Sequence, residues 1–382
     1  MKTYLSELWK ATNKRILFMF FLMALILVIF NALSGGYILR AENFANLIRQ
    51  VTVVAILSVG MTMVIVLGHI DLSVGSALGM FGAITAALID QANMDPVLAV
   101  TIIIVAGFLV GCLHGVLVYY LNIPAFVVTL GGLIAYRGVT QYVARQSIPV
   151  RTEWIKAIAQ NFTPDYLSYF ILALVIIVPV ILTFMNRASI KNAQLPVKTP
   201  LWTEIVKLAV ISLIAVVVIV PLIKGEGIPI QAVVLLIAAV VVGFISRNTP
   251  FGHYVYAIGG NSQAARYSGV SISRNTVLVF GLMTMLSAIC GIITISELSA
   301  AAPDIGDLKE LEAIAACVIG GASLAGGSGA IGMSILGALI MASIKNGMSM
   351  MGVVAQTQKI VLGTVLVFAV ALDQWSRRGK GR

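Results

Sequence analysis

Two ionisable side chains interrupt an apolar stretch of the sequence at GHIDLSVGS, residues 68–76. They are His69 and Asp71, and they lie between two predicted membrane segments. A carboxylate at membrane depth is costly and usually faces water, a partner or a functional cavity. One interpretation is a polar element that lines a permeation path. The other is a short cytoplasmic turn in which Asp71 caps the next helix. The two agree if a broken helix lines a cavity.

A second break in the apolar pattern is rich in glycine and covers residues 320–332. Its segment 327–332, GSGAIG, matches the G-x-G-x-x-G fingerprint of dinucleotide-binding sites. That fingerprint requires a preceding strand in a βαβ unit and an acidic residue about 20 positions further on. Here the segment joins two apolar runs and no such acidic residue follows. We therefore expect these glycines to allow a turn in the membrane and close helix approach.

The sequence lacks the common catalytic motifs. It contains no phosphate-cradling G-x-x-x-x-G-K-[ST], so this chain is not expected to hydrolyse ATP. It also contains no H-E-x-x-H and no paired-cysteine motif, and its three histidines are scattered. No catalytic residue, metal site or bound cofactor is predicted. A chain of this kind is expected to move a substrate rather than convert it.

The composition places the chain in the membrane class, because 59% of its residues are hydrophobic, only 10% are charged and its mean hydropathy is +1.02. A membrane helix needs roughly 20 apolar residues. Full-length runs and shorter, glycine-interrupted runs together predict twelve segments, at about 16–34, 51–68, 72–89, 97–121, 124–144, 169–185, 208–223, 229–246, 275–297, 312–326, 329–345 and 357–373. The predicted fold is an all-α, polytopic membrane helical bundle.

The distribution of the net charge of +10 indicates how the chain is oriented in the membrane and does not indicate nucleic-acid binding. Of the 25 Lys and Arg residues, 15 fall in four segments, which are 1–15, 186–207, 247–274 and 374–382. Basic residues gather on the cytoplasmic side of membrane proteins. An even number of segments also returns both termini to one side. We therefore expect the N- and C-termini and the segment 247–274 to be cytoplasmic.

Two further patterns concern the predicted helices. Gly107, Gly111 and Gly115 repeat every four residues, which predicts a helix face that a neighbouring helix approaches closely. Glu297 ends a predicted membrane helix near the outer face, where we expect it to line an entrance.

The segment 247–274 is the longest polar stretch after residue 224, and it contains a predicted short helix, Ser262 to Ser268. Asn261 can cap the start of that helix, because its side-chain oxygen can accept from a backbone N–H two or three residues on. Gly269 can end it, because glycine readily adopts the left-handed conformation of a C-cap. A capped helix on the surface of a membrane protein suits docking against a soluble partner. The alternative is an ordinary ordered loop.

Four segments of the sequence resemble the membrane permease subunits of bacterial ATP-binding-cassette (ABC) importers for monosaccharides, the group that includes the ribose, galactose and xylose systems. The segments are GMTMVIVLGHIDLSVGSALG, FVVTLGGLIAYRG, YAIGGNSQAARYSGV and ELEAIAACVIGGASLAGGSGAIG. The likeness covers about residues 40–375 and is greatest to the xylose-type permeases. It implies one transmembrane permease domain, 1–382, with ten core helices. The additional sequence at 169–223 implies an extra helix pair.

The resemblance also implies partners and a place in the bacterial inner membrane. A family member works as a permease dimer with two copies of a cytoplasmic ATPase, which uses the ATP, and an extracytoplasmic sugar-binding protein delivers the substrate. By resemblance the segment 247–274 is where the ATPase docks. The residues expected to couple the two subunits are Asn261, Ala264, Ala265, Arg266 and Gly269.

The expected transport mechanism is alternating access, in which contacts with two ATPase states shift the membrane helices. A neutral sugar needs groups that bind hydroxyls and no strong charge. The candidate residues of the translocation path are His69, Asp71, Ser73, Ser76, Asn122 and Thr129. D-xylose is the expected substrate, and a broader pentose or hexose range, as in a multiple-monosaccharide importer, is the alternative.

Two other function classes remain open from the residues alone. An ion-coupled secondary transporter would need intramembrane carboxylates at a central ion site, for which Asp71 and Glu297 are the candidates. Sugar uptake without ATP or the ATPase would favour it. A membrane enzyme acting on lipids or glycans would need an acid–base or metal pair near one interface, and no such pair can be assembled. Turnover of a lipid-linked substrate by the purified chain would favour that class.

Overall fold

The computed structural model describes residues 2–38, 40–192 and 201–378 of the 382-residue chain. In chain order the helices are α1 (Lys2–Leu33), α2 (Ala41–Val66), α3 (Val74–Ala86) with a π-helical extension η1 (Ala87–Gln91), α4 (Pro96–Tyr120), α5 (Ala125–Val143), α6 (Glu153–Gln160), α7 (Asp165–Asn192), α8 (Leu201–Lys224), α9 (Ile230–Asn248), α10 (Pro250–Gly260), α11 (Ser262–Tyr267), α12 (Ile272–Leu298), α13 (Lys309–Ile319), α14 (Ile331–Met350) and α15 (Ala355–Arg378). Among the described residues the only strands are β1 (Ile148–Pro149) and β2 (Ala300–Ala301), which pair antiparallel. The all-α prediction is confirmed.

Each of the twelve predicted segments corresponds to a helix, but the helices are not equivalent. Among the described residues, eight helices are long and apolar enough to cross a membrane, and they are α2, α3 with its extension, α4, α7, α8, α9, α12 and α14. The segment predicted at 312–326 differs most, because α13 has only 11 residues and ends at a glycine turn. A helix of that length rises roughly 16 Å, about half of the hydrocarbon thickness.

Helices α1 and α15 extend into the basic segments 1–15 and 374–382, which we expect to be cytoplasmic tails. Residue 1 and residues 379–382, which belong to those tails, lie outside the described part of the chain. So does 193–200, which carries part of the basic segment 186–207.

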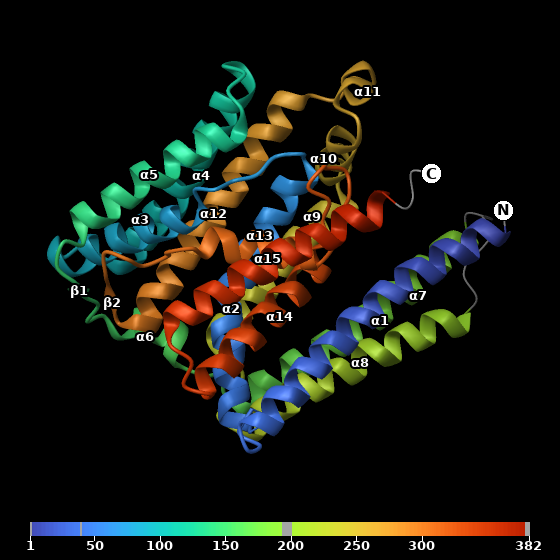
Figure 1. Cartoon of the computed structure of the whole chain (residues 1–382), viewed down its shortest axis with the longest axis horizontal. Helices are drawn as coiled ribbons and strands as arrows, with labels where there is room; N and C mark the ends of the chain where they lie inside the picture. Colours follow the sequence, from blue (N-terminus) through green and yellow to red (C-terminus); the bar gives the residue numbers. More distant parts are fainter. Residues whose placement is uncertain (1, 39, 193–200, 379–382) are drawn as a thin grey trace.

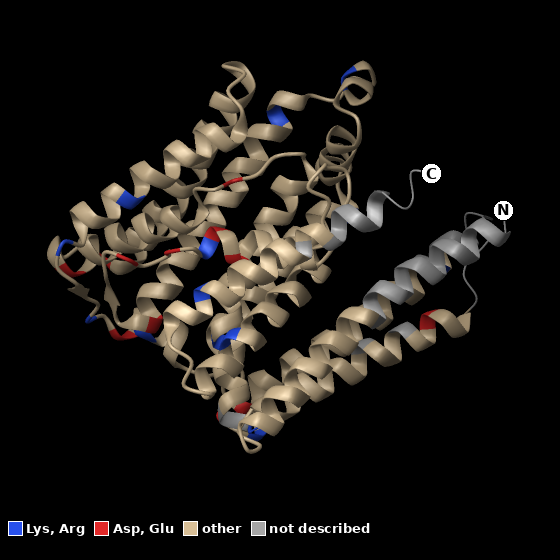
Figure 2. Ribbon diagram, in the orientation of Figure 1, with Lys and Arg blue, Asp and Glu red and all other residues tan. Residues whose placement is uncertain are grey.

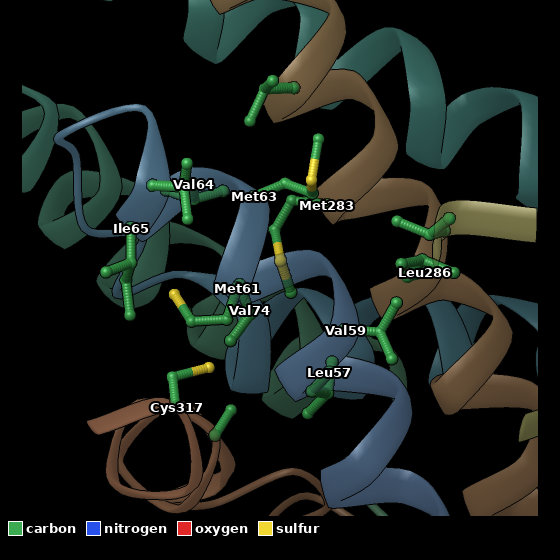
Figure 3. Packing of buried hydrophobic residues seen from close by; sticks show 14 of the residues in the cluster. Leu57, Val59, Met61, Met63, Val64, Ile65, Val74, Met283, Leu286 and Cys317 are labelled. Carbon is green, nitrogen blue, oxygen red and sulfur yellow. The ribbon is translucent and has the colours of Figure 1, made fainter. Parts of the chain in front are cut away.

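The centre of the bundle is formed by α2 and α12, which are buried along most of their length. Met63 of α2 lies beside Met283 of α12, and Met61 lies on the side of α2 that is nearer Val74 and Cys317, as Figure 3 shows. Helices α4, α7, α8 and α9 are instead largely exposed and apolar, as expected of helices that face lipid. The chain therefore forms a buried inner group of helices surrounded by exposed outer ones.

The glycine face predicted on α4 packs against α12, which confirms that prediction. A Cβ atom at Gly111 would overlap the Phe280 carbonyl, and one at Gly115 would overlap the backbone of Val277. A Cβ atom at Gly107 would lie 2.8 Å from the Cβ of Ala288. Helices approach this closely only where small residues line the contact. The fit holds α12 against α4 along several turns.

The additional sequence at 169–223 folds as α7 and α8. In Figure 1 these two helices lie beside α1 in a group that spreads away from the main bundle. The ion pair between Arg187 and Glu204, 2.6 Å apart, links α7 to α8. At the other end of the pair, Ile171 and Leu222 pack on residues of α2 and α9. The pair is thus joined to the bundle at one end only.

The molecule has two distinct ends (Figure 1). One end carries α10 and α11, and the start of α1 and the end of α15 lie toward the same end. The other end carries α6, the β1–β2 pair, and the loops between α1 and α2 and between α14 and α15. Arg266 and Arg274 lie at the α11 end, and most of the acidic residues lie away from it, whereas Glu204 in the first turn of α8 lies toward the same end as the start of α1 (Figure 2).

Candidate functional site

Helix α11 has the caps that the sequence predicts. The side-chain oxygen of Asn261 accepts from the backbone N–H of Ala264 at 2.9 Å. Gly269 adopts φ +81°, its N–H donates to the Arg266 carbonyl, and the Val270 N–H donates to the Ala265 carbonyl. These two bonds form a Schellman motif. The helix ends at Tyr267, one residue before the predicted end.

The residues expected to couple α11 to a partner do not all face outward. Ala264 and Arg266 are exposed, and Tyr267 is 91% exposed. Ala265 is 5% exposed and belongs to the main hydrophobic core. The prediction grouped Ala265 with Ala264 as partner-facing residues. In the structure Ala265 instead anchors α11 to the bundle.

A second helix in this segment, α10, was not predicted. Thr249 caps it by accepting from the Gly252 N–H at 3.3 Å, and Pro250 occupies its first turn. A Thr-Pro pair at this position is a helix-start signal, because threonine caps and proline suits the first turn. Helix α10 connects the end of α9 to the start of α11.

The end of α10 touches both breaks in the membrane helices, at a contact that we call the glycine junction: Val66, Gly68, Gly259, Gly326 and Gly327. The Val66 carbonyl at the end of α2 accepts from the Gly327 N–H at 2.8 Å. A Cβ atom at Gly259 would overlap that same carbonyl, and one at Gly326 would lie 2.7 Å from the Gly259 carbonyl. Three chain segments therefore meet backbone to backbone, with no side chain between them.

Tyr256 makes a further link from α10 to the second break. Its hydroxyl donates to the Gly329 carbonyl at 2.8 Å. Burial raises the pKa of Tyr256, against a smaller opposing effect of Arg247, so the hydroxyl stays protonated and able to donate. Helix α10 therefore contacts both breaks, through Tyr256 and through the glycine junction.

A hollow of about 650 Å³ lies beside α11, between the end of α4 and the end of α10. It contains two of the six predicted path residues, His69 and Asn122, together with the cap residue Asn261. These three come from different parts of the chain.

The other four predicted path residues are buried within the protein: Asp71, Ser73, Ser76 and Thr129. One carboxylate oxygen of Asp71 accepts from the backbone N–H of Ser73 at 2.8 Å and from its hydroxyl at 2.6 Å. Asp71 thus stabilises the turn before α3, whereas Ser73 holds the N-cap position. Asp71 therefore lies two residues before the N-cap position that the capping interpretation gave it.

The opposite end of the bundle contains a polar region that the sequence analysis found only at Glu297. Three adjoining hollows of about 300, 160 and 180 Å³ lie along α2, α12, α13, α14 and α15. Gln50 and Glu297 line the first two, and Lys309, Glu312 and Lys345 line the second and third. We call this set, with Asn46 of the first hollow, the polar trough.

The trough could have been recognised in part from the sequence. Asn43, Asn46 and Gln50 repeat at intervals of three and four residues, so they share one face of α2. Polar residues with that spacing in an apolar helix indicate a face turned away from lipid. Lys309 and Lys345 are 36 residues apart in the numbering, and nothing in the sequence shows that both contact Glu312.

Residues 43–370 match the family described as "Branched-chain amino acid transport system / permease component". The chain is 36% identical to the xylose transport system permease protein XylH of Escherichia coli over 373 residues, which cover 97% of this chain and 94% of that protein. It is 37% identical to XylH of Haemophilus influenzae over 372 residues, 97% of this chain and 98% of that protein. It is 31% identical to the ribose import permease protein RbsC of Escherichia coli over 372 residues, 97% of this chain and 96% of that protein. No solved structure matches.

The multispan bundle with its capped surface helix is a transport subunit and not an enzyme. The chain belongs to the permease family of bacterial ABC importers that carry carbohydrates, as a multi-pass membrane protein. In this family ATP is hydrolysed by a separate ATPase subunit, and a binding protein is the other partner.

Proposed function

We propose that this chain carries D-xylose across the inner membrane, as the permease subunit of an importer driven by a separate ATPase. The observation that supports xylose is the identity of 36–37% to two xylose permeases from different organisms, against 31% to a ribose permease, each over nearly the whole chain. The alternative substrate is another pentose or hexose, or several monosaccharides.

Uptake by the complete importer tests the substrate. The permease is reconstituted with its ATPase and binding protein in vesicles, and uptake of labelled D-xylose is measured with and without ATP. ATP-dependent uptake that unlabelled D-xylose suppresses more strongly than D-ribose supports the proposal. Preferred uptake of another sugar would reject xylose, and uptake without ATP or the ATPase would indicate an ion-coupled secondary transporter.

The proposed topology has ten core helices and the peripheral pair α7–α8, with both termini and α10–α11 in the cytoplasm. The basic residues Arg247, Arg266 and Arg274 near α11 support this orientation. Tyr267 is a suitable reporter because it is 91% exposed. A cysteine at this position should react with an impermeant thiol reagent only after cells are permeabilised. Reaction in intact cells would reverse the orientation.

The proposed coupling passes from the ATPase through α11 to the glycine junction. Ala264, Arg266 and Tyr267 face outward, whereas Asn261, Ala265 and Gly269 fix the helix in place. Because α10 contacts both breaks, one displacement at α11 would shift the ends of α2, α13 and α14 together. A permease homodimer with two ATPase copies would make such movement symmetric about the path.

A further inference from the structure

We infer that the polar trough is where the permease itself recognises its solute, a neutral polyhydroxy compound of pentose size. This inference rests on the proposed function and names residues for it. The hollow between the start of α2 and the ends of α6, α12 and α14 has a volume of about 300 Å³. Small-molecule pockets begin at roughly this volume. The trough therefore suits a small solute.

The trough offers side chains that are free to bind. Within the described part of the chain, Asn46, Gln50 and Glu297 make no hydrogen bond or ion pair with another residue. Amides both donate and accept, and a carboxylate accepts. Sugar hydroxyls have the same dual character, so these groups can pair with neighbouring hydroxyls in a ring.

The charges in the trough favour a neutral solute. Glu312 is held by Lys309 at 2.7 Å and by Lys345 at 3.2 Å. The three hollows are also lined by Glu297, Arg49, Asp307 and Lys359, so four cations and three carboxylates surround them and largely compensate one another. The lysines still have spare N–H donors for hydroxyl oxygens. A neutral solute loses less hydration than a charged one on entering the hollows and needs no counter-charge there.

An amino acid is the main competing solute, because the matching family description names branched-chain amino acids. Its carboxylate would need a cation that is not already paired. In the described part of the trough both lysines pair with Glu312, and Arg49 donates to the Gln160 carbonyl at 2.9 Å. Arg49 and Glu297 line the same hollow, and neither is in an ion pair among the described residues, so they would also suit the two charges of a zwitterion. Labelled leucine in the test below distinguishes an amino acid from a sugar.

The position of the trough fits an entrance for delivered solute. Asn43, beside Asn46, and Val66 of the glycine junction lie on the same helix, roughly 35 Å apart along its axis. That separation is similar to the hydrocarbon thickness of about 30 Å. The trough lies at the end of the bundle away from α11, where solute from a binding protein would arrive. It continues inward to Lys309 and Glu312 at the start of α13.

The test uses the complete importer in vesicles, with D-xylose, D-ribose and leucine as labelled probes. The variants are Gln50→Leu, which removes a hydroxyl-binding amide, and Glu297→Gln, which replaces a charged acceptor with a neutral amide of nearly the same size. Their matched controls are Gln141→Leu on α5 and Glu226→Gln between α8 and α9, both exposed and outside the trough. A second set, Gln50→Asn and Glu297→Asp, keeps the chemistry and shortens the side chain.

We expect each of the first two variants to lower D-xylose uptake roughly tenfold, as loss of a hydrogen bond to substrate does. The ratio of D-xylose to D-ribose uptake should change, and the conservative variants should recover part of the uptake. The controls should match wild type.

Three outcomes would overturn this inference. They are unchanged uptake in Gln50→Leu and Glu297→Gln, an equal loss in the controls, and a loss with no change in the sugar ratio and no recovery in the conservative variants. In all three the wild-type importer still carries a pentose, so the proposed function stands. Uptake of leucine and of no sugar by wild type would instead reject the proposed function.

Discussion

At one end of α2 the backbone of three chain segments meets without intervening side chains, whereas at its other end side chains face open hollows. The Val66 carbonyl, the Gly327 N–H and Gly259 leave no room for a single added carbon atom. Asn46, Gln50 and Glu297 at the other end have room around them and no protein partner among the described residues. The glycine junction is thus defined by close backbone packing, and the trough by polar side chains that are free to form hydrogen bonds. This difference suits transmission of movement at one end and recognition of a solute at the other.

The largest expected effect comes from adding a methyl group at the glycine junction. In Gly259→Ala the new Cβ overlaps the Val66 carbonyl, and a backbone atom cannot move aside as a flexible side chain can. Overpacking of this kind typically costs about 1–3 kcal/mol, so we expect uptake and ATPase stimulation to fall roughly tenfold or more. Both are measured in vesicles.

The neighbouring residue provides the control for this variant. A Cβ atom at Gly260, in the same helix, would meet nothing within 4 Å. Gly260→Ala should therefore retain wild-type uptake. Equal losses in the two variants would mean that helix α10 responds to substitution in general and that the close contact has no special role.

The next largest effect is expected when a charge in the polar trough is removed with little change in side-chain size. Glu312→Gln leaves Lys309 and Lys345 without their carboxylate partner. Breaking a fully buried pair costs about 3–5 kcal/mol, and the partial exposure of these side chains reduces this to about 1–3 kcal/mol. We expect a lower melting temperature of the purified protein in detergent.

A surface ion pair is the matched control for the charge change. Glu153→Gln removes the partner of Lys156, 3.0 Å away, but the Glu153 side chain is 88% exposed. Its melting temperature should stay close to wild type, as expected of surface ion pairs. A stability loss as large as that of Glu312→Gln would contradict the distinct electrostatic role of the trough.

A smaller effect is expected at the cap of α11. Asn261→Ala removes the acceptor for the Ala264 N–H and should cost about 0.5–2 kcal/mol of local helix stability. The expected result is weaker ATPase association with unchanged membrane insertion, measured by co-purification. Asn261→Asp keeps an acceptor and should retain association. Equal binding by all three proteins would show that the cap is not needed for docking.

The smallest effect is expected when the region beside the glycine junction loses one hydrogen bond but keeps its packing. Tyr256→Phe removes the hydrogen bond to the Gly329 carbonyl, a loss of about 0.5–1.5 kcal/mol. If shape governs this region, uptake should decrease no more than a few-fold. A larger loss than in Gly259→Ala would reverse the comparison between the two ends.

Local patterns in the sequence predicted local structure well. Asn261, Gly269 and the glycine face of α4 act within one helix or along one face, and the structure confirms their geometry. The missed features are contacts between distant parts of the chain. Spacing alone cannot bring Gly259 to Val66 or Lys345 to Glu312, because helix packing sets those distances.

The same limit explains the path residues. Asp71 and Ser73 were selected because polar groups in an apolar stretch indicate function, yet here they bind each other at a buried turn. Asn46 and Gln50 were overlooked because they lie at the start of a helix whose remaining sequence is strongly apolar. The repeat of polar residues along one helix face would have been a better guide to the candidate site than single polar residues in an apolar stretch.

Helices α2 and α14 are fastened to each other near both ends. Asn43 and Asn346 exchange side-chain amide hydrogen bonds of 3.1 and 3.2 Å at one end, and the Thr62 hydroxyl donates to the Ser334 hydroxyl at 2.7 Å toward the other. These hydrogen bonds near both ends oppose sliding of the two antiparallel helices along each other. We expect the two helices to tilt as one unit, so on the proposed topology a displacement at the α10–α11 end would move the polar-trough end in the opposite direction.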